Sequence, residues 1–464
     1  MHQAQPSPPL EPRPREFPIP ELITRRVVRA GLCSGCGACV GLDVSGRASM
    51  EQTLQGPVPQ FPADIVLDGR AFDCCPGKGL DYPDLHRRFY GAAPRNWLTG
   101  PTVCVRTGHA TDETIRRASA SGGVLSQVLI YLLEQKLVDA AVVVRQGIPT
   151  PAEARAVFAT SREDILAAAQ SVYIPVSTLD KLRELEPGKR YAMTCLPDQA
   201  AALRWLQLSD HPQAQQVKFV LGPYTGTALY PAAIRSFLRS CGVAGDDAIT
   251  SLKWRAGEWP GYLEIRTQSG RIVRSNKFYY NYLIPFFITR NSLQNMDFAN
   301  EFCDLSVGDA WSPVFESKGG GYSVITTRTA GMETIIQRMI TEGLLTTEPI
   351  DELKATEMHG HMIDFKKRGG YLRNQIRQRL GLPAADFGMK PQPLPCSRVM
   401  VELVISGLFL VGSLAISHWI VERIPERVIG PLFNRLRLAW KSASKPTKRK
   451  GLGNLTMIPT RRDT

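Results

Sequence analysis

The chain has 464 residues, of which 43% are hydrophobic and 21% are charged, and this balance excludes a wholly disordered or fibrous protein. Its mean hydropathy of -0.14 excludes a polytopic membrane protein. The formal net charge is +13, but residues 422–464 carry eleven Lys and Arg against three Asp and Glu. The basic charge therefore belongs largely to a tail, and it does not indicate nucleic-acid binding by the rest of the chain.

Proline dominates the start of the chain, residues 1–27. Seven of the first twenty residues are proline, which favours a mobile, extended leader with polyproline II character. The segment lacks the apolar stretch of a secretory signal, so we expect a cytoplasmic body with reduced thiols.

Three cysteines share one short loop in the next predicted region, residues 28–100. The sequence GLCSGCGACV places Cys33, Cys36 and Cys39 three residues apart. Thiolates at this spacing can bind three corners of an iron–sulfur cubane, and the intervening glycines let the backbone wrap around the inorganic sulfides. The loop therefore predicts most of a ferredoxin-like iron–sulfur site.

A fourth cluster ligand is expected from the sequence AFDCCPGKG. Cys75 stands directly before a proline, as the last cysteine of a bacterial ferredoxin motif does, and Cys74 is the competing choice. Four thiolates also suit a structural zinc ion, but zinc sites usually present two separated pairs of cysteines. The pattern therefore favours one [4Fe-4S] cluster over zinc.

Predicted strands and helices alternate in the central part, residues 101–245. VCVRTGHA and AAVVV are typical of strands, and VLSQVLIYLL repeats apolar residues at helical spacing. This alternation predicts a mixed α/β body. Ser121, Gly122 and Gly123 stand at the start of that helix, where two glycines and the helix dipole favour a bound phosphate. A simple turn and helix cap would explain the same residues.

The pattern changes in the second half of the body, residues 246–390. SLKWRAGEWPGYLEIRTQSGRIVRS alternates apolar and polar residues around a turn and predicts a β-hairpin. DLSVGDAW and YSVITTRT follow, separated by a loop with three glycines, and METIIQRMITEGLL predicts a helix.

The last region, residues 391–464, combines an apolar run with the basic tail. Leu403–Val421 is uncharged, and its length nearly matches a hydrocarbon core of about 30 Å, although Glu402 interrupts its extension. RVIGPLFNRLRLAWKSA sets apolar residues at helical spacing between arginines and lysines, as basic amphipathic helices at anionic membrane surfaces do. We therefore expect a hydrophobic helix and a basic amphipathic tail that attach the body to the cytoplasmic membrane.

The topology of this attachment stays open. Basic residues flank the apolar run on both sides, so a single span conflicts with the positive-inside tendency. An in-plane or re-entrant arrangement is the alternative to a span. A core or oligomer-interface helix is the alternative to membrane attachment.

These motifs, taken in order, resemble those of the coenzyme F-420 hydrogenase/dehydrogenase beta subunit family. The resemblance runs from residue 28 to about 350 and rests on GLCSGCGAC, CPG, SASGGVLS, LPDQAAALR, KWRAGEWPG and DLSVGDAW. Relatives of this family that use flavin and iron–sulfur centres include 7-hydroxymethyl chlorophyll a reductase and ferredoxin-dependent divinyl chlorophyllide reductases. The resemblance implies an FAD-binding α/β body joined to an N-terminal loop that holds one [4Fe-4S] cluster.

Site residues are carried over from the resemblance by position. The implied cluster ligands are Cys33, Cys36, Cys39 and Cys75. The implied flavin-binding residues are Ser121, Gly122, Gly123, Arg255, Gly257, Glu258, Gly308 and Asp309. Arg255 could hold an anion and Asp309 could accept a hydrogen bond from the flavin, while an ordinary Arg–Asp hydrogen bond is the simpler alternative. No residue is assigned to catalysis itself.

The chain departs from the family where further cysteines are expected. Asp198 replaces a cysteine in LPDQ, Ser292 and Asn295 replace a cysteine pair, and Thr225 replaces another. Family members with these thiols can hold a second cluster. The remaining cysteines of this chain are too isolated in sequence to restore it, so we expect one cluster.

The resemblance predicts a reductase or dehydrogenase that depends on FAD and a [4Fe-4S] cluster. The cluster would exchange electrons with ferredoxin or a partner redox subunit, and FAD would serve a deazaflavin, a tetrapyrrole or another conjugated, hydrophobic substrate. The alternative is a non-catalytic electron-relay or scaffold subunit that anchors a partner enzyme at the membrane. The sequence leaves the substrate, the direction of electron flow and the formation of a homo-oligomer open.

Overall fold

A mixed eight-stranded sheet forms the centre of the computed structural model, which describes residues 17–277 and 280–460. Its strands are β3 (Cys104–Ala110), β4 (Ala140–Gln146), β5 (Ala154–Ala159), β6 (Tyr191–Thr194), β7 (Val217–Pro223), β11 (Leu305–Asp309), β12 (Ser323–Thr327) and β13 (Leu345–Pro349). They lie in the order β13-β3-β12-β11-β7-β6-β4-β5. The mixed α/β fold class predicted from the sequence is confirmed.

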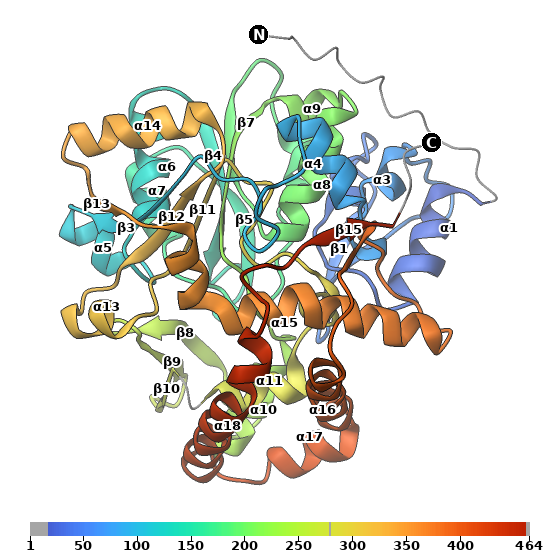
Figure 1. Cartoon of the computed structure of the whole chain (residues 1–464), viewed down its shortest axis with the longest axis vertical. Coiled ribbons are helices and arrows are strands. Elements are labelled where there is room, and N and C mark those ends of the chain that lie inside the picture. Colours follow the sequence, from blue (N-terminus) through green and yellow to red (C-terminus); the bar gives the residue numbers. More distant parts are fainter. Residues whose placement is uncertain (1–16, 278–279, 461–464) are drawn as a thin grey trace.

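Five strands of this sheet end at the same edge. β12 pairs antiparallel with both β3 and β11, so β3 runs in the same direction as β11, β7, β6 and β4, which pair in parallel. Residues that follow these five strands therefore gather at one edge, which we call the carboxyl edge. The long helix α15 (Glu352–Arg379) runs along this edge in Figure 1.

Helices cover both faces of the sheet. On one face, α6 (Val124–Glu134), α7 (Arg162–Ala167) and α14 (Ala330–Thr341) bury apolar side chains against the strands. On the other face, α8 (Pro197–Leu208) and α9 (Pro212–Gln215) pack together with the N-terminal region. The strand and the helix predicted from AAVVV and VLSQVLIYLL are confirmed as β4 and α6, since their apolar residues face the core on the expected periods.

The N-terminal region consists of short elements joined by loops. They are α1 (Ile19–Ile23), η1 (Thr24–Val28), α2 (Ala38–Gly41), the hairpin β1 (Ser49–Thr53) and β2 (Gly56–Gln60), α3 (Arg70–Asp73), η2 (Pro76–Lys78) and α4 (Tyr82–Tyr90). The loop with three cysteines precedes α2 and runs into it.

The described end of the predicted extended leader is helical instead. α1 continues into the π-helical turn η1. Pro20 fits the first turn of α1, where its missing N–H costs no hydrogen bond, and Leu22, Ile23 and Val27 are buried. Burial of these apolar side chains outweighs the local preference of a proline-rich sequence. Residues 1–16 of that predicted leader lie outside the described residues.

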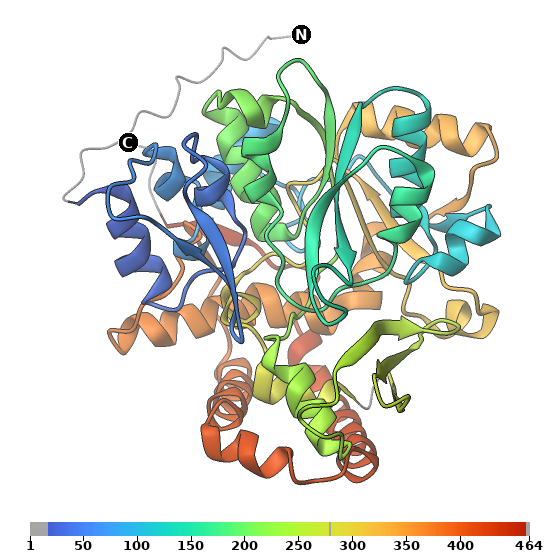
Figure 2. The ribbon, with the colours of Figure 1, turned by 180° about the vertical axis from the view of Figure 1, so that it is seen from behind.

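A smaller antiparallel sheet lies beside the carboxyl edge. It contains β8 (Ile249–Ala256), β9 (Tyr262–Thr267) and β10 (Ile272–Asn276), which confirms the predicted hairpin. These strands share a core with α10 (Ala232–Ser240), η4 (Tyr280–Leu283) and α11 (Ile284–Phe287). Figure 2 shows the small sheet and α10 from behind. The remaining short helices are α5 (Glu113–Ala118), η3 (Leu179–Glu184), α12 (Arg290–Gln294) and α13 (Pro313–Lys318).

The C-terminal region adds three helices at one end of the molecule (Figure 1). They are α16 (Cys396–Gly412), α17 (Ala415–Val421) and α18 (Glu426–Arg449), with a small pair of strands, β14 (Met389–Pro391) and β15 (Met457–Pro459). Among the described residues, no single helix has the length and apolarity to cross a membrane. α16 and α17 together meet those criteria, but they are bent by 78°. The apolar run thus forms two helices and not the one expected.

Candidate functional site

Four thiols from two separate loops come together in the N-terminal region. Cys33, Cys36 and Cys39 lie on the loop that leads into α2, and Cys75 directly precedes η2. Burial raises the pKa of all four thiols, to about 12 for Cys33, and charges on neighbouring thiols raise the values for the three loop cysteines further. Groups that act on one another in this way are close in space. The structure therefore places the four predicted cluster ligands within electrostatic range of one another.

Backbone N–H groups surround the same thiols. Each of these donors lowers the pKa of the thiol that accepts its hydrogen bond: Gly35 acts on Cys33, Ala38 on Cys36, Val40 on Cys39, and Gly77 and Lys78 on Cys75. Donors placed in this way stabilise thiolates, and hydrogen bonds to sulfur tune the reduction potentials of iron–sulfur clusters. The loops thus supply both the thiols and the donors that such a cluster requires.

The cysteine loop is fixed to the body of the protein at its glycines. Gly37 has a φ of +84°, and a Cβ at this position would lie 2.8 Å from the backbone nitrogen of Asp180. Next to it, the carbonyl of Cys36 accepts a hydrogen bond from the Leu179 N–H at 3.0 Å. A larger residue in place of Gly37 would push the loop away from η3, so the glycine spacing of the motif serves the packing as well as the turn.

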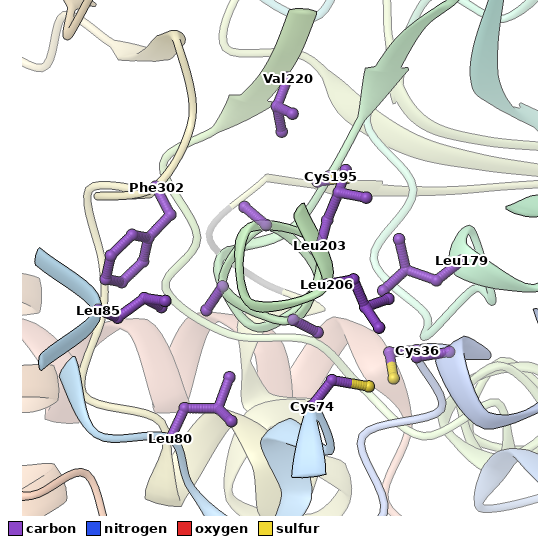
Figure 3. Packing of buried hydrophobic residues seen from close by; sticks show 14 of the residues in the cluster. Cys36, Cys74, Leu80, Leu85, Leu179, Cys195, Leu203, Leu206, Val220 and Phe302 are labelled. Carbon is purple, nitrogen blue, oxygen red and sulfur yellow. The ribbon is translucent and has the colours of Figure 1, made fainter. Parts of the chain in front are cut away.

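Cys74 lies beside the same site. Its side chain is fully buried, and its sulfur points toward Cys36 at the margin of the apolar core in Figure 3. Cys75 raises the pKa of Cys33, Cys36 and Cys39, whereas Cys74 acts on that of Cys39 within this loop. Cys75 thus stays the predicted fourth ligand, with Cys74 as the neighbour to test against it.

The four thiols are not arranged as a binding site for a single metal ion. In the part of the chain that the structure describes, no group of three or more His, Cys, Asp or Glu side chains has the geometry to hold a single metal ion. A [4Fe-4S] cluster binds each of its four thiolates through a different iron. The assignment of a cluster therefore depends on the cysteine spacing and the N–H donors.

Polar residues stand at the positions where the family has further cysteines. Asp198, Ser292 and Asn295 are all buried. The ammonium group of Lys366 donates a hydrogen bond to the Ser292 carbonyl at 2.8 Å, and it faces the charge of Asp198. Burial lowers the pKa of Lys366 to about 7, with Arg373 acting in the same direction. Polar side chains thus stand at these three positions instead of thiols, and the buried Lys366 lies next to two of them.

A second candidate site is a cavity of about 560 Å³ between the turn after α5 and the β8–β9 hairpin. Four predicted flavin-binding residues line it: Ser121, Arg255, Gly257 and Glu258. Sequence reasoning missed other lining residues, which include Arg116, Arg117, Trp259, Lys318 and Tyr322. The paired arginines and the loop with three glycines were visible in the sequence, but nothing there placed them opposite each other.

The cavity is basic and contains donors with free hydrogen-bonding capacity. Arg255 Nη1 pairs with Asp309 Oδ2 at 2.8 Å, and Arg255 Nε donates to the Pro260 carbonyl at 3.0 Å. Burial acts to lower the pKa of Arg255, but Asp309 raises it. Among the described residues, the buried Arg255 Nη2 and Trp259 Nε1 have no hydrogen-bond partner. Because buried donors are usually satisfied, the cavity suits an anionic ligand that accepts hydrogen bonds.

Four other predicted flavin residues do not line the cavity but support its wall. Gly123 has a φ of +76° at the start of α6, and a Cβ on Gly122 would lie 2.8 Å from a carbonyl oxygen of β3. A Cβ on Gly308 would lie 2.5 Å from the ring of Tyr224. These glycines therefore allow close packing, and Asp309 forms the ion pair with Arg255.

Both candidate sites lie along the carboxyl edge of the main sheet. Asp198, which acts on three of the clustered thiols, follows β6, and Asp309 ends β11. β7 lies between these two strands. Neighbouring strands are about 4.8 Å apart, so the ends of β6 and β11 are separated by roughly 10 Å. This edge is where open α/β sheets commonly bind their ligands.

An α/β chain that combines clustered thiols with a basic cavity on one sheet edge has the organisation of an electron-transferring redox subunit. The models of the coenzyme F420 hydrogenase/dehydrogenase beta subunit match it in two parts, the N-terminal model over residues 105–183 and the C-terminal model over residues 188–353. The chain belongs to this family. The matched ranges end before α16, so the three C-terminal helices lie beyond them.

Three curated relatives are named coenzyme F420 hydrogenase subunit beta. The one from Methanosarcina barkeri is 22% identical over 55% of this chain and 84% of its own length. Those from Methanothermobacter thermautotrophicus and Methanococcus voltae are 23% and 26% identical, over 60% of this chain and 95% of their own lengths. In the solved F420-reducing [NiFe] hydrogenase complex from Methanosarcina barkeri, one chain matches with a TM-score of 0.49 and 19% identity, over 62% of this chain and 97% of that chain.

Proposed function

We propose that this protein is an electron-transferring oxidoreductase subunit with one [4Fe-4S] cluster and one FAD. Cys33, Cys36, Cys39 and Cys75 would hold the cluster, and the cavity between α5 and the β8–β9 hairpin would hold the flavin. A ferredoxin or a partner redox subunit would exchange electrons at the thiol site. The relatives are named as hydrogenase subunits, which supports a partner subunit of this kind.

The observation that carries the proposal is that four thiols influence one another's pKa while five backbone N–H groups act on the same thiols. Buried thiols resist ionisation, so a site built from them is favourable when bound metal compensates the thiolate charge. The spacing of three cysteines on one loop with a fourth before a proline is that of iron–sulfur proteins.

The cavity supports a flavin dinucleotide through its size and its charge. A volume of about 560 Å³ falls in the range of small-molecule sites, roughly 300–1,000 Å³. The guanidinium groups of Arg116 and Arg117 and the ammonium of Lys318 suit a pyrophosphate, and the free donors of Arg255 and Trp259 suit the carbonyl and ring atoms of a flavin. A bound flavin exchanges electrons singly or in pairs, which joins one-electron clusters to two-electron substrates.

The substrate class follows from the relatives and from the proposed flavin. Proteins named coenzyme F420 hydrogenase subunit beta support a deazaflavin as the partner of the cavity. A tetrapyrrole or another conjugated, hydrophobic molecule is the other substrate class to include in a screen.

Anaerobic purification followed by iron, sulfide and flavin analysis tests the proposal. We expect about four irons per chain and one flavin, and we expect reduced ferredoxin to bleach the flavin absorption. Cys75→Ser should abolish the iron content, whereas Cys74→Ser, its matched neighbour, should retain it. If Cys74→Ser loses the cluster and Cys75→Ser retains it, Cys74 is the fourth ligand. A brown protein without flavin would instead support the electron-relay alternative, and a protein with zinc and no iron would contradict the proposal.

A further inference from the structure

A large set of apolar side chains stays exposed on the three C-terminal helices. Each member has at least 36% of its surface exposed, and at several the exposed fraction exceeds half. Monomeric soluble proteins rarely leave contiguous apolar patches of this kind uncovered. We call the set the C-terminal apolar face; it consists of Met400, Leu403, Val404, Leu408, Leu410, Val411, Leu414, Ile416, Trp419, Ile420, Val428, Leu432, Leu436, Leu438 and Trp440.

Buried ion pairs bind α16 to the body of the protein. Glu402, which interrupts the apolar run, is fully buried and pairs with Arg373 at 2.6 Å and Arg398 at 3.1 Å. Arg398 also pairs with Asp364 of α15 at 3.0 Å. Two of these pairs, Arg373–Glu402 and Arg398–Asp364, join α15 to α16, and breaking buried ion pairs is strongly unfavourable. α16 therefore belongs to the body and is not free to leave it.

The apolar run lies against the body as two helices joined at a sharp bend. α16 has 17 residues and α17 has 7, whereas a span requires about 20 in one direction. At the 78° bend, Gly412 approaches so closely that a Cβ would lie 2.2 Å from the carbonyl oxygen of Pro285. His418 Nε2 lies 2.9 Å from the Phe286 carbonyl oxygen. α16 and α17 thus contact the body on one side, and their exposed apolar side chains lie on the other side.

α18 separates its apolar and basic residues on the outside of the molecule. Val428, Leu432, Leu436 and Trp440 recur every four residues and form an exposed stripe. The inward side of the helix is different, since Ile429 and Phe433 pack into the core of the small sheet. Arg427, Arg435, Lys441 and Lys445 of the same helix are exposed as well. An apolar stripe with adjacent cations is the arrangement of helices that lie in the surface of anionic membranes.

We propose that α16, α17 and α18 form a monotopic docking surface that inserts the C-terminal apolar face into one leaflet of an anionic bilayer, parallel to its plane. The exposed Trp419 and Trp440 would sit at the headgroup level, where tryptophan is enriched. A second copy of the chain is a poorer occupant, because a two-fold contact through this face would bring the two rows of cations together. The proposal does not depend on the bound cofactors.

The docking surface also places the small sheet next to the lipid. Val421 and the inward side of α18 share their core with Trp254 of β8, the residue before Arg255 in the cavity wall. Membrane binding would therefore hold the candidate flavin cavity near the bilayer, on the side from which a hydrophobic substrate would arrive.

Vesicle co-sedimentation of the full-length protein tests the docking surface. We expect binding to vesicles of phosphatidylcholine mixed with phosphatidylglycerol and much weaker binding to phosphatidylcholine alone. Leu410→Glu should abolish binding, while Leu380→Glu should leave it unchanged, since both leucines are 68% exposed and Leu380 lies outside the C-terminal apolar face. Lys441→Ser with Lys445→Ser should weaken binding about fivefold per lysine, and Lys189→Ser with Lys218→Ser serves as the matched control.

The depth of insertion separates an in-plane helix from a span. Tryptophan fluorescence of the bound protein should be quenched by lipids brominated near the headgroup and little by lipids brominated near the chain ends, with Trp419→Phe/Trp440→Phe as the background. Stronger quenching from the chain ends would overturn the in-plane arrangement. Equal binding by Leu410→Glu and Leu380→Glu would overturn the surface itself. A dimer that Leu410→Glu dissociates, without any vesicle binding, would assign the face to a second copy of the chain. Circular dichroism of each variant confirms that it is folded.

Discussion

At the scale of single residues, Arg255 connects the parts of the candidate flavin cavity. It lies on β8, its side chain is 3% exposed, and it pairs with Asp309 at the end of β11. One of its nitrogens remains available to a ligand. Because a buried ion pair that loses one partner leaves an uncompensated charge, this residue is expected to matter both for the wall of the cavity and for what the cavity binds.

Replacing this arginine should weaken flavin binding. Arg255→Met removes the free donor and leaves Asp309 without its partner, and a hydrogen bond from a charged group contributes about 1.5–3 kcal/mol, so we expect at least about tenfold weaker FAD binding. Fluorescence titration of the flavin-depleted protein with FAD measures this change. Arg266→Met, on the neighbouring strand and 51% exposed, should bind FAD as the unmodified chain does. Equal FAD affinities of the two variants would show that Arg255 does not bind the flavin.

Residues within the quoted motifs were predictable, and cavity residues outside those motifs were not. The four thiols could be predicted because three share one short loop and the fourth precedes a proline. Arg116 and Lys318 were missed, since the cavity joins segments far apart in the chain. Arg116 Nε donates to the Gly320 carbonyl at 2.9 Å, across 204 positions, and no local pattern encodes such a pairing.

At the scale of elements, a buried ion network joins α15 to α16. Asp364, Arg368 and Arg373 on α15 face Arg398 and Glu402 on α16. The sequence places Glu402 directly before the apolar run Leu403–Val421, and such a charge is unfavourable in a free hydrophobic helix. The structure explains this residue, because Glu402 is buried in the body while its neighbours Leu403 and Val404 are exposed.

Breaking this network should destabilise the fold. Glu402→Gln leaves Arg373 without its carboxylate and Arg398 with Asp364 alone in a buried site, and breaking a buried pair in this way costs about 3–5 kcal/mol in the free energy of unfolding. Urea unfolding compares this variant with Asp64→Asn, which removes an exposed partner of Arg47 and should leave the midpoint unchanged. Coinciding midpoints for the two variants would mean that α16 is held by its apolar contacts alone.

Local pattern also fails where tertiary contacts override it. The segment 19–28 has the composition of an extended leader, yet burial of three apolar side chains makes it helical. The apolar run of the C-terminus has the length of one helix, yet the close contact of Gly412 with Pro285 coincides with a sharp bend. In both cases a tertiary contact decides the conformation, and the local sequence does not reveal that contact.

At the scale of the whole molecule, the carboxyl edge of the main sheet organises the two proposed redox sites. β3 and β4 were predictable from their apolar runs, but β5, β13 and the order of the strands were not, since β3 lies between β12 and β13, which follow it by more than two hundred positions. This order places the thiol site and the cavity on one edge and the C-terminal helices at one end of the molecule (Figure 1).

A Mössbauer spectrum of the anaerobically purified, iron-enriched protein tests the central claim most directly. The account predicts a cubane signal with all iron coordinated by sulfur, unchanged in Cys74→Ser and absent in Cys75→Ser. A spectrum without cluster iron, from a protein in which metal analysis finds zinc bound to the same thiols, would contradict it.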